Sequence, residues 1–302
     1  MNDKMLKHYL TPGVYTNPAC YKYYFLSLPH DIPELGKLVC SQVIHRITLR
    51  EGNTNANKNL VYGDIQKFPW HRMRCEDDIL LTAAAMTAEL FRLDNRGFTL
   101  ERQVENKIVV TCRYVSVLMT AILKAKGIPC RSRSGFAPYF NEGLSFDHWI
   151  NQYWSRQDSR WINFDADFLE DDRIEFNQYD IPFDKFDWAA DTWLKIRKNE
   201  VNGNTFVYAG GEKSLSAAIR AVFYDFHALM NNEISYLFQP AYISGKFEKL
   251  SEKDLTEIDS LAYLMLDPDK NFDALYEIWN NNKKFRVLNS PLVGDTDNDI
   301  II

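Results

Sequence analysis

The sequence predicts an α+β fold, in which one long buried helix packs on a small antiparallel sheet. Residues 112–125 are apolar apart from one narrow polar stripe, as in a helix that is buried on most sides. Residues 148–155 and 160–168 are short, aromatic segments on either side of a polar turn, which is typical of an antiparallel hairpin. Further helical patterns precede and follow these segments, so helical N- and C-terminal regions are expected around this core.

Two helices are expected before residue 112. Residues 32–43 carry apolar side chains at helical spacing, and Pro33 suits a first helical turn. Residues 51–59 have the composition of a loop. Residues 76–93 are Ala-rich and apolar on one face, and their acidic start suits the positive end of a helix dipole.

The helix predicted over residues 112–125 has clear start and stop signals. Thr111 is a suitable N-cap, Gly127 fits the position after the last turn, and Pro129 prevents the helix from continuing. Its polar stripe consists of side chains spaced three or four residues apart: Arg113, Ser116, Thr120 and Lys124. Cys112 therefore falls in the first turn of the helix.

Helical patterns return in the last third of the chain. Residues 214–234 are a strong helix candidate, and residues 251–266 and 269–282 predict two more helices, each with a capping Ser or Asp. The C-terminal part is therefore expected to be mostly helical.

The expected organisation is a central core with elaborations on both sides. Residues 1–75 predict an N-terminal helical or irregular elaboration, residues 76–175 the core, and residues 176–302 a mostly helical C-terminal elaboration. No long Pro-, Gly- or Ser-rich linker separates these parts, so a single compact unit is expected.

Composition and charge exclude several classes of function. The 302 residues carry a net charge of -6 with scattered Lys and Arg, so nucleic acid is not an expected partner. The N-terminus lacks the apolar region of a secretory signal, and no apolar run approaches the ~18 residues of a membrane span. A cytoplasmic protein without a membrane partner is expected. The five cysteines, an odd number, indicate free thiols rather than a disulfide framework.

No metal and no cofactor are expected. A zinc site would need closely spaced Cys and His pairs, and neither C-x-x-C nor H-x-x-x-H occurs. His45, His71 and His227 each lie beside large apolar residues, so we interpret them as structural histidines. The cysteines other than Cys112 are interpreted as packed side chains.

Cys112 is the candidate nucleophile. Unpaired N–H groups and the positive dipole end of a helix N-terminus favour a thiolate. Catalysis also needs a base and a group that orients it, and the predicted hairpin offers His148 and Asp165. Alternation along the second strand places Asp167 on the same face as Asp165, so periodicity does not choose between the two aspartates.

This ordered set resembles the core of the transglutaminase-like superfamily, over about residues 76–168. The matching positions are Cys112-Arg113, Leu123, Gly127-Ile128-Pro129, Arg131, Gly135, His148, Trp161 and Asp165. The chain departs from the pattern at Val110, where the family usually has Gly, and at Cys130, where it often has Ala. Neither departure removes a member of the family's triad.

The resemblance implies a papain-like fold with a Cys112, His148, Asp165 triad that forms a thioester. His148 takes the proton of Cys112, Asp165 orients the imidazole, and the backbone N–H of Cys112 donates to the oxyanion. Trp70 or His71 are candidates for the second oxyanion donor.

The substrate expected from the resemblance is a peptide, an amide or a small acyl compound. A cysteine protease or amidase is the first expectation. The alternatives are an amine acyltransferase with the same triad and a non-catalytic binding module of the same fold. The sequence indicates no oligomeric state.

Overall fold

The computed structural model describes residues 3–46, 69–72, 76–167, 174–243 and 247–287. The expected loop at 51–59 and Cys75 lie outside these residues. Within the described part, contacts divide the chain into two compact units. Their bounds are Met1–Arg133 with His148–Lys185 for unit 1, and Ser134–Asp147 with Phe186–Ile302 for unit 2. The division expected from the sequence, at residues 75 and 175, stays a prediction.

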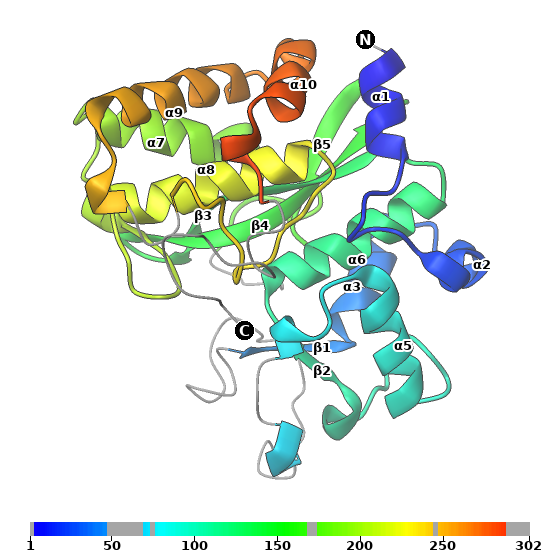
Figure 1. The fold of residues 1–302 in the computed structure, drawn as a ribbon. Helices are drawn as coiled ribbons and strands as arrows, with labels where there is room; N and C mark the ends of the chain where they lie inside the picture. Colours follow the sequence, from blue (N-terminus) through cyan, green and yellow to red (C-terminus); the bar gives the residue numbers. More distant parts are fainter. Residues whose placement is uncertain (1–2, 47–68, 73–75, 168–173, 244–246, 288–302) are drawn as a thin grey trace. The chain divides into compact units, whose positions relative to one another are not determined.

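Unit 1 is built around helix α6. Its described α-helices are α1 (Asp3–Leu10), α2 (Lys22–Ser27), α3 (Ile32–Cys40), α5 (Ala83–Leu93) and α6 (Cys112–Ala125). Single 3₁₀ turns occur at Ala19–Tyr21, Trp70–Arg72, Glu76–Asp78, Val104–Asn106 and Phe183–Lys185. Helices α2, α3 and α5 each pack against α6 (Figure 1), and every residue from Cys112 to Lys124 is buried.

The described strands form two sheets. In the smaller one, β1 (Val43–His45) pairs in parallel with β2 (Ile108–Val110). In the larger one, hydrogen bonds join the strands in the order β5-β4-β3-β6, and β7 pairs with β4. The bounds of these strands are Cys130–Asn141 for β3, Leu144–Ser155 for β4, Arg160–Phe164 for β5, Asp187–Trp188 for β6 and Phe206–Val207 for β7.

The predicted α+β fold class and the hairpin are confirmed. In unit 1, β4 and β5 pair antiparallel, with Asn151 opposite Phe164 and Ser155 opposite Arg160. The turn between them is closed by the Ser155 hydroxyl, which donates to the Asp158 carboxylate over 2.7 Å and accepts from the Asp158 backbone N–H. Strand β4 begins at Leu144, four residues before the predicted segment, because it also forms a hairpin with β3 across Gly143.

Two predicted helices differ from the observed ones, and tertiary contacts explain both differences. The helix expected over 32–43 ends at Cys40, since residues 43–45 form β1 and pair with β2. The helix expected over 76–93 is a 3₁₀ turn followed by α5. The Glu76 carboxylate accepts a hydrogen bond from the Val109 N–H, and Thr82 starts a new helix by capping the Ala85 N–H.

Helix α6 has the predicted bounds, 112–125. Thr111 occupies the N-cap position, but its side chain makes no capping hydrogen bond, contrary to the prediction. At the other end Gly127 has a φ of +79°, and the N–H groups of Gly127 and Ile128 donate to the carbonyls of Lys124 and Leu123. This is the glycine-terminated helix end that the sequence predicts.

The polar stripe of α6 is buried and hydrogen-bonded. Ser116 Oγ donates to the Ile150 carbonyl over 3.2 Å, and Thr120 Oγ1 lies 3.0 Å from Ser132 Oγ. Asn151 Nδ2 donates to both the Ser116 carbonyl (2.9 Å) and Thr120 Oγ1 (2.8 Å). The middle of the stripe, at Ser116 and Thr120, therefore faces strands β3 and β4.

Unit 2 contains α7 (Ala189–Arg197), α8 (Leu215–Leu229), α9 (Glu252–Met265) and α10 (Phe272–Asn281). Its 3₁₀ turns are Gly203–Thr205, Phe247–Lys249 and Lys283–Phe285. Helix α7 packs against both α8 and α9, as Figure 1 shows. Strand β6 pairs with β3 at Gly135, where a Cβ would collide with the Asp187 carbonyl oxygen. A glycine is therefore required at that crossing.

The helices predicted for unit 2 are present with shorter bounds. Helix α8 ends at Leu229 because Asn231 adopts a φ of +55° and the Asn232 N–H closes on the His227 carbonyl. Ser251 caps α9 as predicted, in a reciprocal pair with Asp254. The N-cap of α10 is Asn271, without a side-chain cap, rather than an aspartate. Among the helices described in both units, none combines the length and the apolar character of a bilayer span.

Candidate active site

Cys112 is the first residue of α6, directly after β2 and Thr111. Its side chain is 4% exposed. Strand β2 is held by an ion pair beside it, because Arg72 binds the Glu76 carboxylate and also donates to the Lys107 carbonyl over 2.7 Å. Glu76 Oε2 accepts from the Val109 N–H over 2.7 Å. The backbone that leads into Cys112 is therefore fixed by partly buried polar contacts as well as by strand pairing.

His148 and Asp165 meet in unit 1. His148 lies on β4 and Asp165 directly follows β5, and His148 Nε2 lies 2.7 Å from Asp165 Oδ2. The second carboxylate oxygen, Oδ1, accepts from the Asp167 backbone N–H over 3.1 Å. Because Nε2 of His148 is hydrogen-bonded to Asp165, Nδ1 is the ring nitrogen available to interact with Cys112. The imidazole is thus held in one orientation by a carboxylate that is itself fixed.

His148 is flanked by two groups that favour its protonated form. Burial alone would lower the pKa of this histidine, because a buried charge loses its hydration. The negative charges of Asp165 and of the Cys112 thiolate, together with a hydrogen bond to each, outweigh that effect. They raise the pKa of His148 well above its ordinary value. The arrangement therefore favours the imidazolium form of His148.

Asp167 lies beside the site but binds a different group. The thiol of Cys40 donates to the Ala166 carbonyl over 2.9 Å, and its sulfur lies 3.9 Å from Asp167 Oδ1. Burial raises the pKa of Asp167 to about 7, against the positive charge of His148, which lowers it. The carboxylate in contact with His148 is that of Asp165.

The two residues considered as second oxyanion donors lie on the surface. Trp70 and His71 belong to the 3₁₀ turn Trp70–Arg72, where their rings contact each other edge to face at 5.7 Å. Trp70 is 83% exposed and His71 is also exposed. Oxyanion donors act in sites from which water is excluded, so this exposure argues against both residues.

His45, interpreted from the sequence as a structural histidine, lies next to the candidate site in the fold. His45 is the last residue of β1 and lies opposite Val110, two residues before Cys112. Burial, together with the positive charges of His148 and Arg46, lowers its pKa to about 3. The imidazoles of His45 and His148 are therefore close enough to interact. No short sequence motif indicates that His45 lies near His148, because the pairing of β1 with β2 joins distant parts of the chain.

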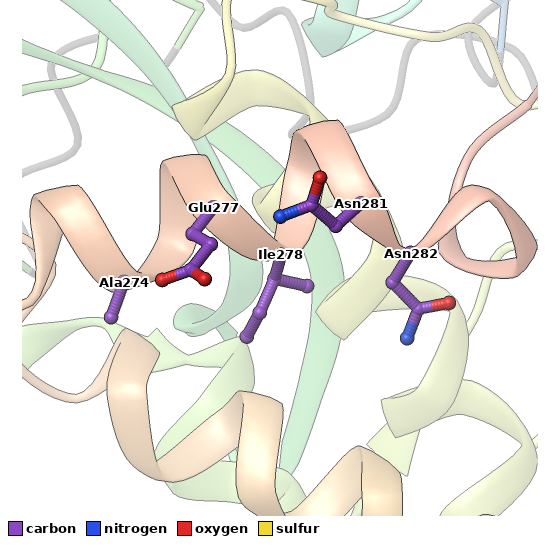
Figure 2. A pocket seen from close by; sticks show the side chains of 5 residues that line it. All are labelled: Ala274, Glu277, Ile278, Asn281 and Asn282. Carbon is purple, nitrogen blue, oxygen red and sulfur yellow. The ribbon is translucent and has the colours of Figure 1, made fainter.

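Two recesses occur among the described residues of unit 2. Figure 2 shows a recess along α10, lined by Ala274, Glu277, Ile278, Asn281 and Asn282. A second recess lies beside α8, where Arg220 pairs with Glu212 over 3.0 Å. Neither is lined by a cysteine or a histidine. Across the described residues, no group of three His, Cys, Asp or Glu side chains is placed to hold a metal ion.

One part of the chain resembles a known protein family. Residues 99–166 match the model of the Transglutaminase-like superfamily, which confirms the predicted resemblance for this part of the chain. Cys112, His148 and Asp165 all lie within this segment, which is similar to the transglutaminase-like core.

One solved structure resembles part of the chain. A Cytophaga hutchinsonii protein, provisionally described as a cysteine protease, is 15% identical with a TM-score of 0.34. The likeness covers 63% of this chain and 50% of that one, so this chain spans about half the length of that protein. No curated protein matches the chain significantly.

Proposed function

We propose that this protein is a cysteine hydrolase that cleaves an amide or peptide bond through a thioester on Cys112. The observation that carries the proposal is the placement of His148 between Cys112 and Asp165, with the electrostatics of an ion pair. Cys112, His148 and Asp165 are the proposed catalytic residues. A peptide, an amide or a small acyl compound is the proposed substrate.

The reaction proceeds in two halves. The Cys112 thiolate attacks the carbonyl carbon, and the imidazolium of His148 then gives its proton to the departing amine. The carbon–nitrogen bond breaks and a thioester remains. In the second half His148 takes a proton from water, the resulting hydroxide equivalent attacks the thioester, and the carboxylic acid leaves while the thiolate–imidazolium pair is restored. Asp165 keeps the imidazole in one orientation throughout.

We expect iodoacetamide to alkylate Cys112 at pH 6 at least about tenfold faster than Cys20. An ordinary thiol is only about 0.3% thiolate at that pH, whereas the proposed ion pair with His148 would keep Cys112 as a thiolate. Cys20 is the reference, since it is a free and exposed thiol. Peptide mass spectrometry identifies the alkylated residue.

The pH dependence follows from the raised pKa of His148. Its proton is retained as pH rises past the usual range of histidine and is lost only as pH passes the raised pKa. The alkylation rate of Cys112 should therefore stay nearly constant from pH 6 to 7, while that of Cys20 rises almost tenfold. His148→Ala should abolish the plateau, and His30→Ala, at an exposed histidine, should keep it. A Cys112 that reacts no faster than Cys20 would contradict the proposal and favour a non-catalytic binding module.

The product distinguishes hydrolysis from amine transfer. We expect a peptide mixture incubated with the protein to yield fragments that have gained water, even with butylamine present, because hydrolysis is the proposed second half-reaction. Mass spectrometry separates such fragments from amides of butylamine. Amides as the dominant product would identify the protein as an amine acyltransferase instead. Cys112→Ala is the control and should give neither product.

A further inference from the structure

Acyl transfer through Cys112 places a negative charge on the carbonyl oxygen of the substrate. This inference rests on the proposed function, since only an acyl-transfer enzyme forms that oxyanion. Hydrogen-bond donors aimed at the oxyanion usually supply a large part of the rate enhancement. The backbone N–H of Cys112, at the first position of α6, is a donor of this kind, whereas the N–H of Tyr114 already donates to the Thr111 carbonyl. A further donor can come from another element beside the start of α6.

Strand β1 is the element that ends there. Its parallel register with β2 places Val43 opposite Ile108 and His45 opposite Val110. Neighbouring strands lie about 4.8 Å apart. Both strands run toward the start of α6, so the last residue of β1 lies beside the segment that enters Cys112. His45 is partly buried rather than fully enclosed.

The electrostatic setting of His45 keeps its imidazole neutral. Desolvation and the positive charges of His148 and Arg46 lower its pKa to about 3. At pH 6 to 8 the ring therefore carries one N–H and no net charge. A neutral imidazole can donate to an oxyanion without exchanging its proton with the acid–base pair of His148. Neutral histidines act as electrophiles in this way in other enzymes.

We propose that the ring N–H of His45 is the second hydrogen-bond donor to the carbonyl oxygen that is attacked by Cys112. The bond forms as the carbonyl becomes tetrahedral, because the negative charge then appears on the oxygen. The proton stays on the imidazole. When the tetrahedral intermediate collapses, the electron pair returns to the carbon–oxygen bond and the donor bond weakens. His45 thus acts on the substrate, and His148 acts on the nucleophile and the leaving group.

Two reagents that react with the same sulfur separate these roles. p-Nitrophenyl acetate acylates a thiolate through an oxyanion and releases a burst of p-nitrophenolate. Iodoacetamide alkylates the thiolate by direct displacement at carbon, with no oxyanion. A residue that stabilises only the oxyanion therefore changes the first rate and leaves the second unchanged. A residue that supports the Cys112–His148 pair changes both rates together.

Three variants are compared with the wild type: His45→Leu, His45→Gln and His30→Ala. Leu and Gln both remove the imidazole, but only Gln keeps an N–H donor. We expect His45→Leu to slow the burst about 10²-fold, within the range for loss of one oxyanion donor. His45→Gln should be at least about tenfold faster than His45→Leu. All three variants should alkylate at the wild-type rate.

The outcomes that would overturn the inference are distinct from failure of the proposed function. Equal burst rates for His45→Leu and wild type, or for His45→Leu and His45→Gln, would refute a donor role. Parallel loss of burst and alkylation in His45→Leu would mean that His45 acts through Cys112 and His148. A wild-type protein with neither a burst nor rapid alkylation would instead refute the thioester mechanism itself, and this inference with it.

Discussion

Replacing Asp165 by asparagine is expected to slow acylation of Cys112 about 10³- to 10⁴-fold, as loss of the orienting carboxylate does in serine triads. Asparagine keeps the size of the side chain but removes the charge that supports the protonated form of His148. It can also present an N–H₂ group to Nε2, which would favour the wrong tautomer of the imidazole. The measurement is the burst of p-nitrophenolate from p-nitrophenyl acetate at pH 7.

Asp167→Asn is the matched control for that variant. It makes the same chemical change two residues away, in the same buried segment, at a carboxylate that lies beside Cys40 rather than His148. Burial raises the pKa of Asp167 to about 7, so replacing it by a neutral amide removes less charge at pH 7 than at an ordinary carboxylate. We therefore expect less than about a tenfold effect. Equal losses in the two variants would contradict the assignment of Asp165 as the orienting residue.

Replacing Arg102 by methionine is expected to lower the free energy of unfolding by about 3–5 kcal/mol, the range for breaking a buried charged network. The guanidinium is 4% exposed and donates to four acceptors in unit 1. These are Gln42 Oε1 at 2.6 Å, the Asn106 carbonyl at 2.9 Å, the Leu90 carbonyl at 3.1 Å and the Gly97 carbonyl at 2.5 Å. Methionine fills much of the volume but leaves these acceptors without their donor.

The measurement is chemical denaturation followed by tryptophan fluorescence, with Arg92→Met as the comparison. Arg92 is a surface arginine that pairs with Glu89 on the same helix, and its side chain is 64% exposed. Its loss should change stability little, because exposed ion pairs are screened by solvent. A loss for Arg102→Met no larger than for Arg92→Met would show that water replaces the missing donor.

Local sequence signals were sufficient for the parts of the fold that depend on neighbouring residues. Helix α6 has the predicted bounds because Gly127 and Pro129 end it whatever packs around it. The β4–β5 hairpin was predictable because its aromatic strands flank a short polar turn. His148 and Asp165 could be paired for the same reason, since His148 lies on one strand of that hairpin and Asp165 directly follows the other.

Contacts between residues far apart in the sequence determine the features of the fold and the candidate site that the sequence did not predict. Residues 79–82 left the predicted helix because Glu76 binds a backbone N–H of β2, far along the chain. Alternation put Asp165 and Asp167 on one face, and only the position of Cys40, on α3, separates their surroundings. His45 was interpreted as structural because nothing near it in the sequence shows that β1 ends beside Cys112.

The buried polar stripe of α6 determines how accurately the nucleophile is positioned. Apolar surfaces can slide over one another at little cost, and a one-residue slip would move a helix by about 1.5 Å and turn it by about 100°. Here such a slip would leave the Ser116 hydroxyl and the Asn151 amide without partners in a dry environment. Directional hydrogen bonds thus fix the position of the thiol along the helix axis and its rotation about that axis. The surrounding apolar packing stabilises the helix but does not determine this position.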